Sequence, residues 1–156
     1  LDTPLAAGLP IGRASLAVAS GTIGVVGPAI TGWKQDLPLG QRIVVDPVAE
    51  FNVVLYAGTV LQPDPCLTTL PAYVYGRDYV SAESLIYSGG VVQPHFYTAE
   101  GAVGLDMVAL EDPTSSFPVL AGVTSGGDAA GGIKPFEIKP KSFGGGHRLS
   151  WRILGD

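Results

Sequence analysis

The sequence predicts a mainly β protein, built as a compact barrel or sandwich of short strands. Three observations support this fold class. Short apolar runs rich in β-branched and aromatic residues recur along the chain, 22 glycines and 13 prolines separate them, and no window of a dozen residues combines helical periodicity with a cap. A mean hydropathy of +0.33 argues against disorder. The length of 156 residues suits one domain with its own core.

The first residues have a different character. Two prolines and two glycines interrupt the small apolar residues of positions 1–13, and proline cannot donate to a strand ladder. We therefore expect an extended N-terminal arm at 1–13 and a single β domain at 14–156. The arm residues predicted to contact a partner are Leu1, Thr3, Pro4, Leu5, Leu9, Pro10 and Ile11.

Short strands and turns alternate through the rest of the chain. A hairpin is expected around Ser20 and Gly21, a turn at 79–85, and a flexible glycine-rich loop at 125–132. Two strands with the period of two typical of a half-buried strand should close the chain, one around Phe136 and Ile138 and one at 149–153. The remaining strands are expected at 42–45, 51–56, 72–75, 78–80, 95–97, 105–110 and 118–123.

An internal β repeat stands out in the middle of the chain. Residues 55–63 and 86–94 match in Tyr, Gly, Val, Gln and Pro at a spacing of 31 positions. A period of this size indicates one supersecondary unit used twice, here a strand with a bulge or a tight turn at its glycine. Tyr56 and Tyr87 occupy equivalent places in the two copies, and with Trp33 they are the candidate interface aromatics.

Charge is sparse and unevenly distributed. Only 15% of the residues are charged, so the surface should expose apolar area that a partner covers. The net charge of −5 argues against nucleic-acid binding. The long uncharged stretch at 14–33 contains too many glycines for a membrane-spanning helix. We therefore expect a self-associating protein with neither a nucleic-acid nor a membrane partner.

The chain contains no recognisable catalytic, cofactor or metal-ligand pattern. Cys66 is the single cysteine, and the glycine runs lack the flanks of a phosphate loop. We therefore predict no enzymatic activity, no cofactor and no metal. A hydrolase would have to use His95 or His147. A carbohydrate-binding β-sandwich is a further alternative, because tyrosine rings can stack on sugars; the tyrosines are Tyr56, Tyr73, Tyr75, Tyr79, Tyr87 and Tyr97.

In its overall pattern the chain resembles the head decoration, or cement, proteins of tailed bacteriophages. The resemblance rests on the arm from Thr3-Pro4-Leu5 to Gly12 and on residues 119–123 with the glycine-rich loop at 126–132. It implies a homotrimer on the capsid exterior of the virion, where it binds the major capsid protein and stabilises the shell. One Asn and one Met in the chain fit a thermostable particle component. Another minor capsid or tail component is the nearest alternative.

Overall fold

The computed structural model describes residues 14, 16–25, 32–61, 70–99, 101–102, 104–110, 119–125 and 133–140. No α-helix occurs in these ranges, and the prediction of a mainly β chain is confirmed. The strands are β1 (Ala17–Val18), β2 (Trp33–Lys34), β3 (Gln41–Ile43), β4 (Val48–Glu50), β5 (Val53–Val60), β6 (Ala72–Asp78), β7 (Ile86–Ser88), β8 (Val91–Gln93), β9 (Phe96–Thr98), β10 (Gly104–Leu110), β11 (Val119–Ser125) and β12 (Ile133–Ile138).

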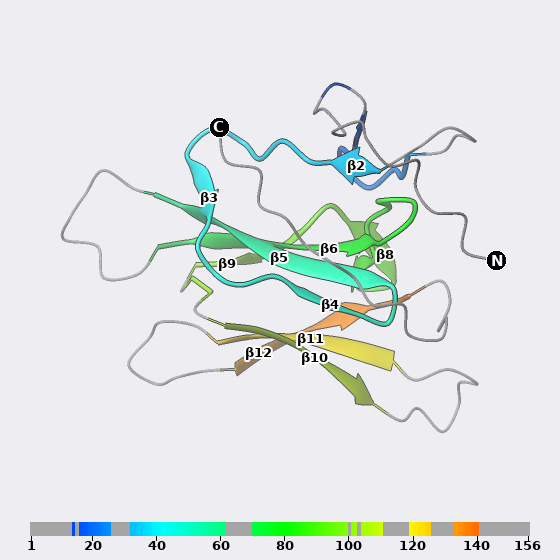
Figure 1. Ribbon diagram of the computed structural model, residues 1–156. Helices are drawn as coiled ribbons and strands as arrows, with labels where there is room; N and C mark the ends of the chain where they lie inside the picture. Colours follow the sequence, from blue (N-terminus) through cyan, green and yellow to red (C-terminus); the bar gives the residue numbers. More distant parts are fainter. Residues whose placement is uncertain are drawn as a thin grey trace.

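These strands form three sheets (Figure 1). The first, here the β5 sheet, has the order β3-β5-β6-β9, with β4 also paired to β5. The second, here the β11 sheet, has the order β10-β11-β12-β7-β8. Both are antiparallel, whereas β1 and β2 form a small parallel ribbon on the far side of the β5 sheet from the β11 sheet. The described strands do not close into a barrel.

One apolar core lies between the two large sheets. Alternate residues of β5 and β6 point into it, as the period of two requires, and the next residues along each strand point to the opposite face. Across the core, the ring of Phe96 stacks on that of Phe136 at a centroid distance of 4.9 Å. The buried core residues are Val53, Leu55, Ala57, Ala72, Val74, Leu85, Ile86, Ala102, Met107, Phe136 and Ile138.

The predicted alternation near the C-terminus is confirmed in β12. Phe136 and Ile138 are buried, while Glu137 is half-buried and Lys139 is exposed. β12 lies between β11 and β7, so its buried side chains join the core. The strand predicted at 149–153 lies outside the described residues, as does most of the loop predicted at 125–132.

Two strand predictions were wrong at their ends, because local turns take over there. Phe51 and Asn52 have positive φ angles of 50° and 61° and connect β4 to β5 as a two-residue hairpin loop of the kind that matches strand twist. Of the strand expected at 78–80, Asp78 is the last residue of β6, and residues 79 and 80 belong to the turn that follows it. The Asp78 carboxylate oxygen Oδ1 accepts the backbone N–H groups of Val80 and Ser81 at 3.0 and 2.7 Å, which bends the chain away from the sheet.

The two copies of the sequence repeat agree in structure only at their beginning. Leu55 and Ile86 both enter the core, and both pack beside Gly76. The copies diverge at the glycine: Gly58 lies inside the continuous strand β5, whereas Gly89 and Gly90 form the turn between β7 and β8. Two successive residues with positive φ, 57° and 80°, make that turn, and the first copy has only one glycine at this point.

Candidate interaction surfaces

The outer face of the β5 sheet holds a row of aromatic rings, here the aromatic strip. Tyr56 and Tyr75 lie opposite each other on β5 and β6 and stack at a centroid distance of 5.2 Å. Tyr73 continues the row at 5.2 Å from Tyr97 of β9, and His95 meets the Tyr73 ring edge to face at 4.8 Å. Antiparallel pairing of β5, β6 and β9 therefore aligns rings that are far apart in the sequence.

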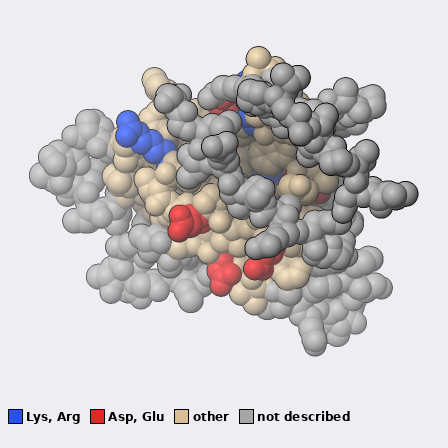
Figure 2. All heavy atoms as spheres, viewed as in Figure 1, with Lys and Arg blue, Asp and Glu red and all other residues tan. Residues whose placement is uncertain are grey.

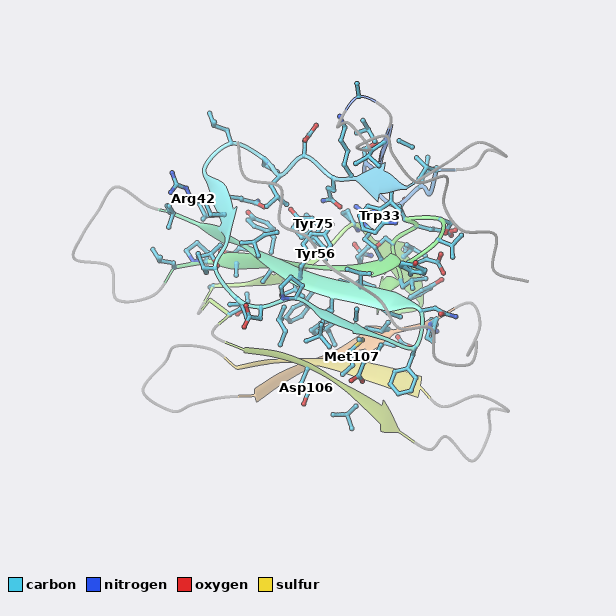
Figure 3. The ribbon with its side chains drawn as sticks, in the orientation of Figure 1. Trp33, Arg42, Tyr56, Tyr75, Asp106 and Met107 are labelled. Carbon is cyan, nitrogen blue, oxygen red and sulfur yellow. The ribbon has the colours of Figure 1, made fainter. Side chains whose placement is uncertain are left out.

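Residues 33–41 cover one end of the aromatic strip, above the β5 sheet (Figure 3). The indole Nε1 of Trp33 donates to the Tyr79 carbonyl at 2.8 Å. At the other end of this segment, the Tyr75 hydroxyl donates to Gln41 Oε1 at 3.0 Å. The segment is thus attached to the sheet by polar contacts at both ends.

A buried arginine lies under the middle of this segment. Arg77 is 1% exposed and follows Tyr73 and Tyr75 on the same face of β6. Its Nε donates to Gln35 Oε1 at 3.0 Å and its Nη1 donates to the Ala82 carbonyl at 3.1 Å. Gln35 Oε1 also accepts the Tyr56 hydroxyl at 2.5 Å, so one amide oxygen joins both strands of the sheet to the covering segment.

Burial and the Arg77 charge change the titration of the strip. Burial raises the pKa of Tyr56 well above its usual value, against the smaller opposing effect of Arg77. The pKa of Tyr75 is raised by burial too, and its bond to Gln41 opposes this shift. The pKa of His95 is lowered, first by burial and then by the Arg77 charge. Each of these three shifts favours the uncharged form of its side chain.

Among the described rings of the aromatic strip, exposure is greatest at the β9 end. Tyr56 is 6% exposed, whereas Tyr97 is 51% exposed, and Tyr73 and His95 between them are half-buried. The Tyr73 and Tyr97 rings are inclined by 52°. This end offers one exposed ring beside two half-buried rings, a suitable size for one small planar or ring-shaped group.

A second surface, here the corner patch, surrounds β3 at the edge of the β5 sheet. It consists of Leu39, Ile43, Val44 and Leu61, all exposed, with Leu39 standing fully in solvent. A turn with Gly40 at a φ of 86° projects Leu39 outward, and the Leu61 N–H donates to the Gly40 carbonyl at 3.1 Å. Arg42 of β3 is also exposed at this edge, and in the part of the face that Figure 2 colours, the charged side chains stand among uncharged atoms.

Of the candidate interface aromatics, the structure brings Trp33 and Tyr56 into one cluster and places Tyr87 on the other sheet. Tyr56 is inside the aromatic strip and Trp33 is half-buried above it. Tyr87 lies on the outer face of the β11 sheet, where the Lys139 ammonium stands 4.8 Å from its ring centroid. The arm residues Leu1, Thr3, Pro4, Leu5, Leu9, Pro10 and Ile11 lie outside the described residues, as does His147.

Sequence reasoning missed the polar centre of the strip. The signal was available in the alternation of Tyr73, Tyr75 and Arg77, which places all three on one face of a strand. Ending that strand at Tyr75 left Arg77 out of the set. Gln35 and Gln41 carry no comparable signal, because their role depends on a segment folding back over the sheet.

No protein-family model matches the chain, and no curated protein or solved structure is significantly similar to it. Within the described ranges, no group of His, Cys, Asp or Glu side chains could hold a metal ion. The same part of the chain contains no helix long and apolar enough to cross a membrane.

Proposed function

We propose that this chain is a structural virion protein that decorates and stabilises the outside of a capsid shell. It binds the lattice of the major capsid protein as a homotrimer. Residues 14–156 form a β-sandwich body, and residues 1–13 form an arm that lies on the shell. No catalytic step or cofactor is part of this proposal.

The observation that supports this role most directly is the corner patch. Four large apolar side chains stand in solvent around one sheet edge of a chain with few charges. Exposed apolar side chains grouped in this way mark contact sites for other proteins. On a symmetric shell, many weak contacts of this kind add by multivalency, and an arm that orders on docking adds to each of them.

Polar substitution of the corner patch tests the proposal. We expect the double variant Leu39→Asp with Val44→Asp to bind expanded empty shells of the source phage at least about tenfold more weakly in co-sedimentation. Burial of one such side chain contributes roughly 1.5–3 kcal/mol, and about 1.4 kcal/mol corresponds to a factor of ten. Val91→Asp is the matched control, because Val91 is 62% exposed on β8 of the other sheet. Equal shell binding by the double variant and the wild type would contradict the proposal.

The exposed end of the aromatic strip favours a second candidate function, carbohydrate binding. Tyr97, Tyr73 and His95 bring three rings together where one of them is open to solvent. In that case the isolated chain would bind glycans, Tyr97→Ala would abolish binding, and removal of residues 1–13 would have little effect. Binding to purified tails in place of shells would indicate another minor capsid or tail component.

A further inference from the structure

β10 is an edge strand of the β11 sheet. All seven of its residues pair with β11 on one side, and no described strand pairs with its other side. Figure 1 shows it along the lower margin of the molecule. An edge of this length offers a row of backbone N–H and C=O groups to another strand.

The sequence of β10 has few of the features that protect sheet edges from pairing. It contains neither proline nor lysine, and Asp106 is its single charge. Met107 is buried in the core, while Asp106 points away from it (Figure 3). Val108, on the same face as Asp106, is 43% exposed.

One contact of Asp106 shows which backbone groups face the open side. The Met107 N–H donates to the Asp106 carboxylate oxygen Oδ1 at 2.8 Å, so it is directed away from the ladder with β11. Successive N–H groups of a strand point alternately to its two sides. The N–H groups of Leu105, Met107 and Ala109 therefore share the open side. In a single chain, the Asp106 carboxylate accepts the central of these N–H groups, that of Met107. A carbonyl group of a pairing strand would take its place as the acceptor.

We propose that β10 pairs antiparallel with β10 of a second copy of this chain, centred on Met107. In this register residue 107 lies opposite 107, 106 opposite 108, 105 opposite 109 and 104 opposite 110, so the whole strand is used in both copies. Opposed side chains in an antiparallel pair share one face, which keeps both cores on the same side of a continuous sheet. The contact is closed by a two-fold axis and exposes no new edge.

The charge pattern agrees with this register. Asp106 lies opposite the partner's Val108 and not opposite the partner's Asp106, so no like charges meet directly. The pairing does not depend on the proposed capsid role. It is a two-fold contact, separate from the three-fold association proposed above, so it predicts a doubling of the mass of the species that pairs.

Sedimentation equilibrium of the full chain, without any shell, tests this pairing. We expect a reversible doubling of mass with concentration. Val108→Glu places a carboxylate opposite each Asp106 and should weaken the pairing roughly 2- to 30-fold, because two symmetric cross-strand pairs change together. Val108→Lys should strengthen it by a similar factor. Asp106→Lys added to Val108→Glu places opposite charges across the pair, so the double variant should dimerise at least as strongly as the wild type, like Val108→Lys.

Cross-linking tests the register itself. In a Cys66→Ser background, Asp106→Cys mixed with Val108→Cys should give a covalent dimer of the two variants on oxidation, because directly opposed residues of this pair type lie about 4.5 Å apart. Absence of that dimer, a wild type without concentration-dependent doubling, or equal effects of Val108→Glu and Val108→Lys would each overturn the proposal. Shell binding by the same protein would remain a separate question.

Discussion

A guanidinium with 1% exposure needs hydrogen-bond acceptors, because a buried charge loses its hydration. Arg77 finds two of them in Gln35 and in the Ala82 carbonyl. Gln35 at the same time accepts the Tyr56 hydroxyl. A single amide oxygen, Gln35 Oε1, therefore accepts hydrogen bonds from two buried donors. These two bonds attach residues 33–41 to β5 and β6.

Gln35→Ala should lower the free energy of unfolding in urea by about 2–6 kcal/mol. The substitution leaves the Tyr56 hydroxyl and the Arg77 Nε without their shared acceptor, and each unsatisfied buried donor costs about 1–3 kcal/mol. Lys139→Ala is the control, since the Lys139–Glu137 ion pair is exposed and should contribute less than about 1 kcal/mol. A loss from Gln35→Ala no larger than that of the control would show that the shared acceptor is not important.

His95 gives the aromatic strip a pH dependence of known sign. Its pKa is lowered below 6.5 in the folded chain by burial and by the Arg77 charge, so the folded state takes up the proton less readily than the unfolded state. The free energy of unfolding should therefore fall as the pH drops below about 6.5. His95→Gln should remove the part of this fall in unfolding free energy that comes from His95. Urea unfolding between about pH 8 and pH 5 measures it. His147 is present in both proteins, so its contribution cancels in the comparison. Identical pH profiles would contradict the assignment.

At the scale of single residues, the sequence predicts which face of a strand a side chain occupies better than which residues that side chain contacts. The period of two correctly places Phe136 and Ile138 inward. The internal repeat made Tyr56 an interface candidate, and in the structure residues 33–41 fold over this side chain and bury it. A contact between residues 21 positions apart depends on the path of the chain, and no local pattern in the sequence encodes it.

Among the elements, the turns are determined by backbone conformation. Gly90 and Gly101 both have positive φ, 80° and 83°, but their surroundings differ. Nothing lies within 4 Å of a Cβ built on Gly90, whereas a Cβ on Gly101 would stand 2.6 Å from the Leu70 carbonyl oxygen. The first glycine is required by its turn alone, and the second also by a close approach of two backbones.

Gly101→Ala should therefore destabilise the chain more than Gly90→Ala. The strain of a positive φ costs about 1–2 kcal/mol at either position, and Gly101→Ala adds a clash with backbone that cannot rotate away. Thermal unfolding of the two variants measures the difference. Gly21→Ala, with a φ of 59° and no neighbour within 4 Å, should behave like Gly90→Ala. Equal losses of stability in Gly90→Ala and Gly101→Ala would show that the backbone moves enough to remove the clash between the new Cβ at position 101 and the Leu70 carbonyl oxygen.

The strands themselves were largely predictable, and their ends were not. Runs such as Val53–Val60 and Ala72–Asp78 contain enough β-branched and aromatic residues to be found from composition. β4 was missed, because three residues beside Pro47 give no period. The repeat predicted similar structures for two segments, but the second glycine of the later copy changed a strand into a hairpin.

For the whole molecule, composition predicted a β-rich chain with a sparsely charged surface, and both features appear in the described residues. The pairing of β12 with β7, far apart in the sequence, could not be predicted, because long-range strand order is set by the joint burial of all the inward faces. The corner patch depends in the same way on how β3 meets the end of β5.

The central claim is that the chain binds a capsid shell as an oligomer through its arm and its apolar surface. Its most direct test is the mass of the full chain by light scattering, followed by co-sedimentation with expanded empty shells, for the wild type and for a chain lacking residues 1–12. We predict a trimer, or a pair of trimers, that sediments with the shells, and a deletion variant that keeps its β circular dichroism spectrum but stays in solution. A wild-type monomer that does not sediment with the shells would contradict the proposed capsid role. So would a deletion variant that binds the shells as fully as the wild type does.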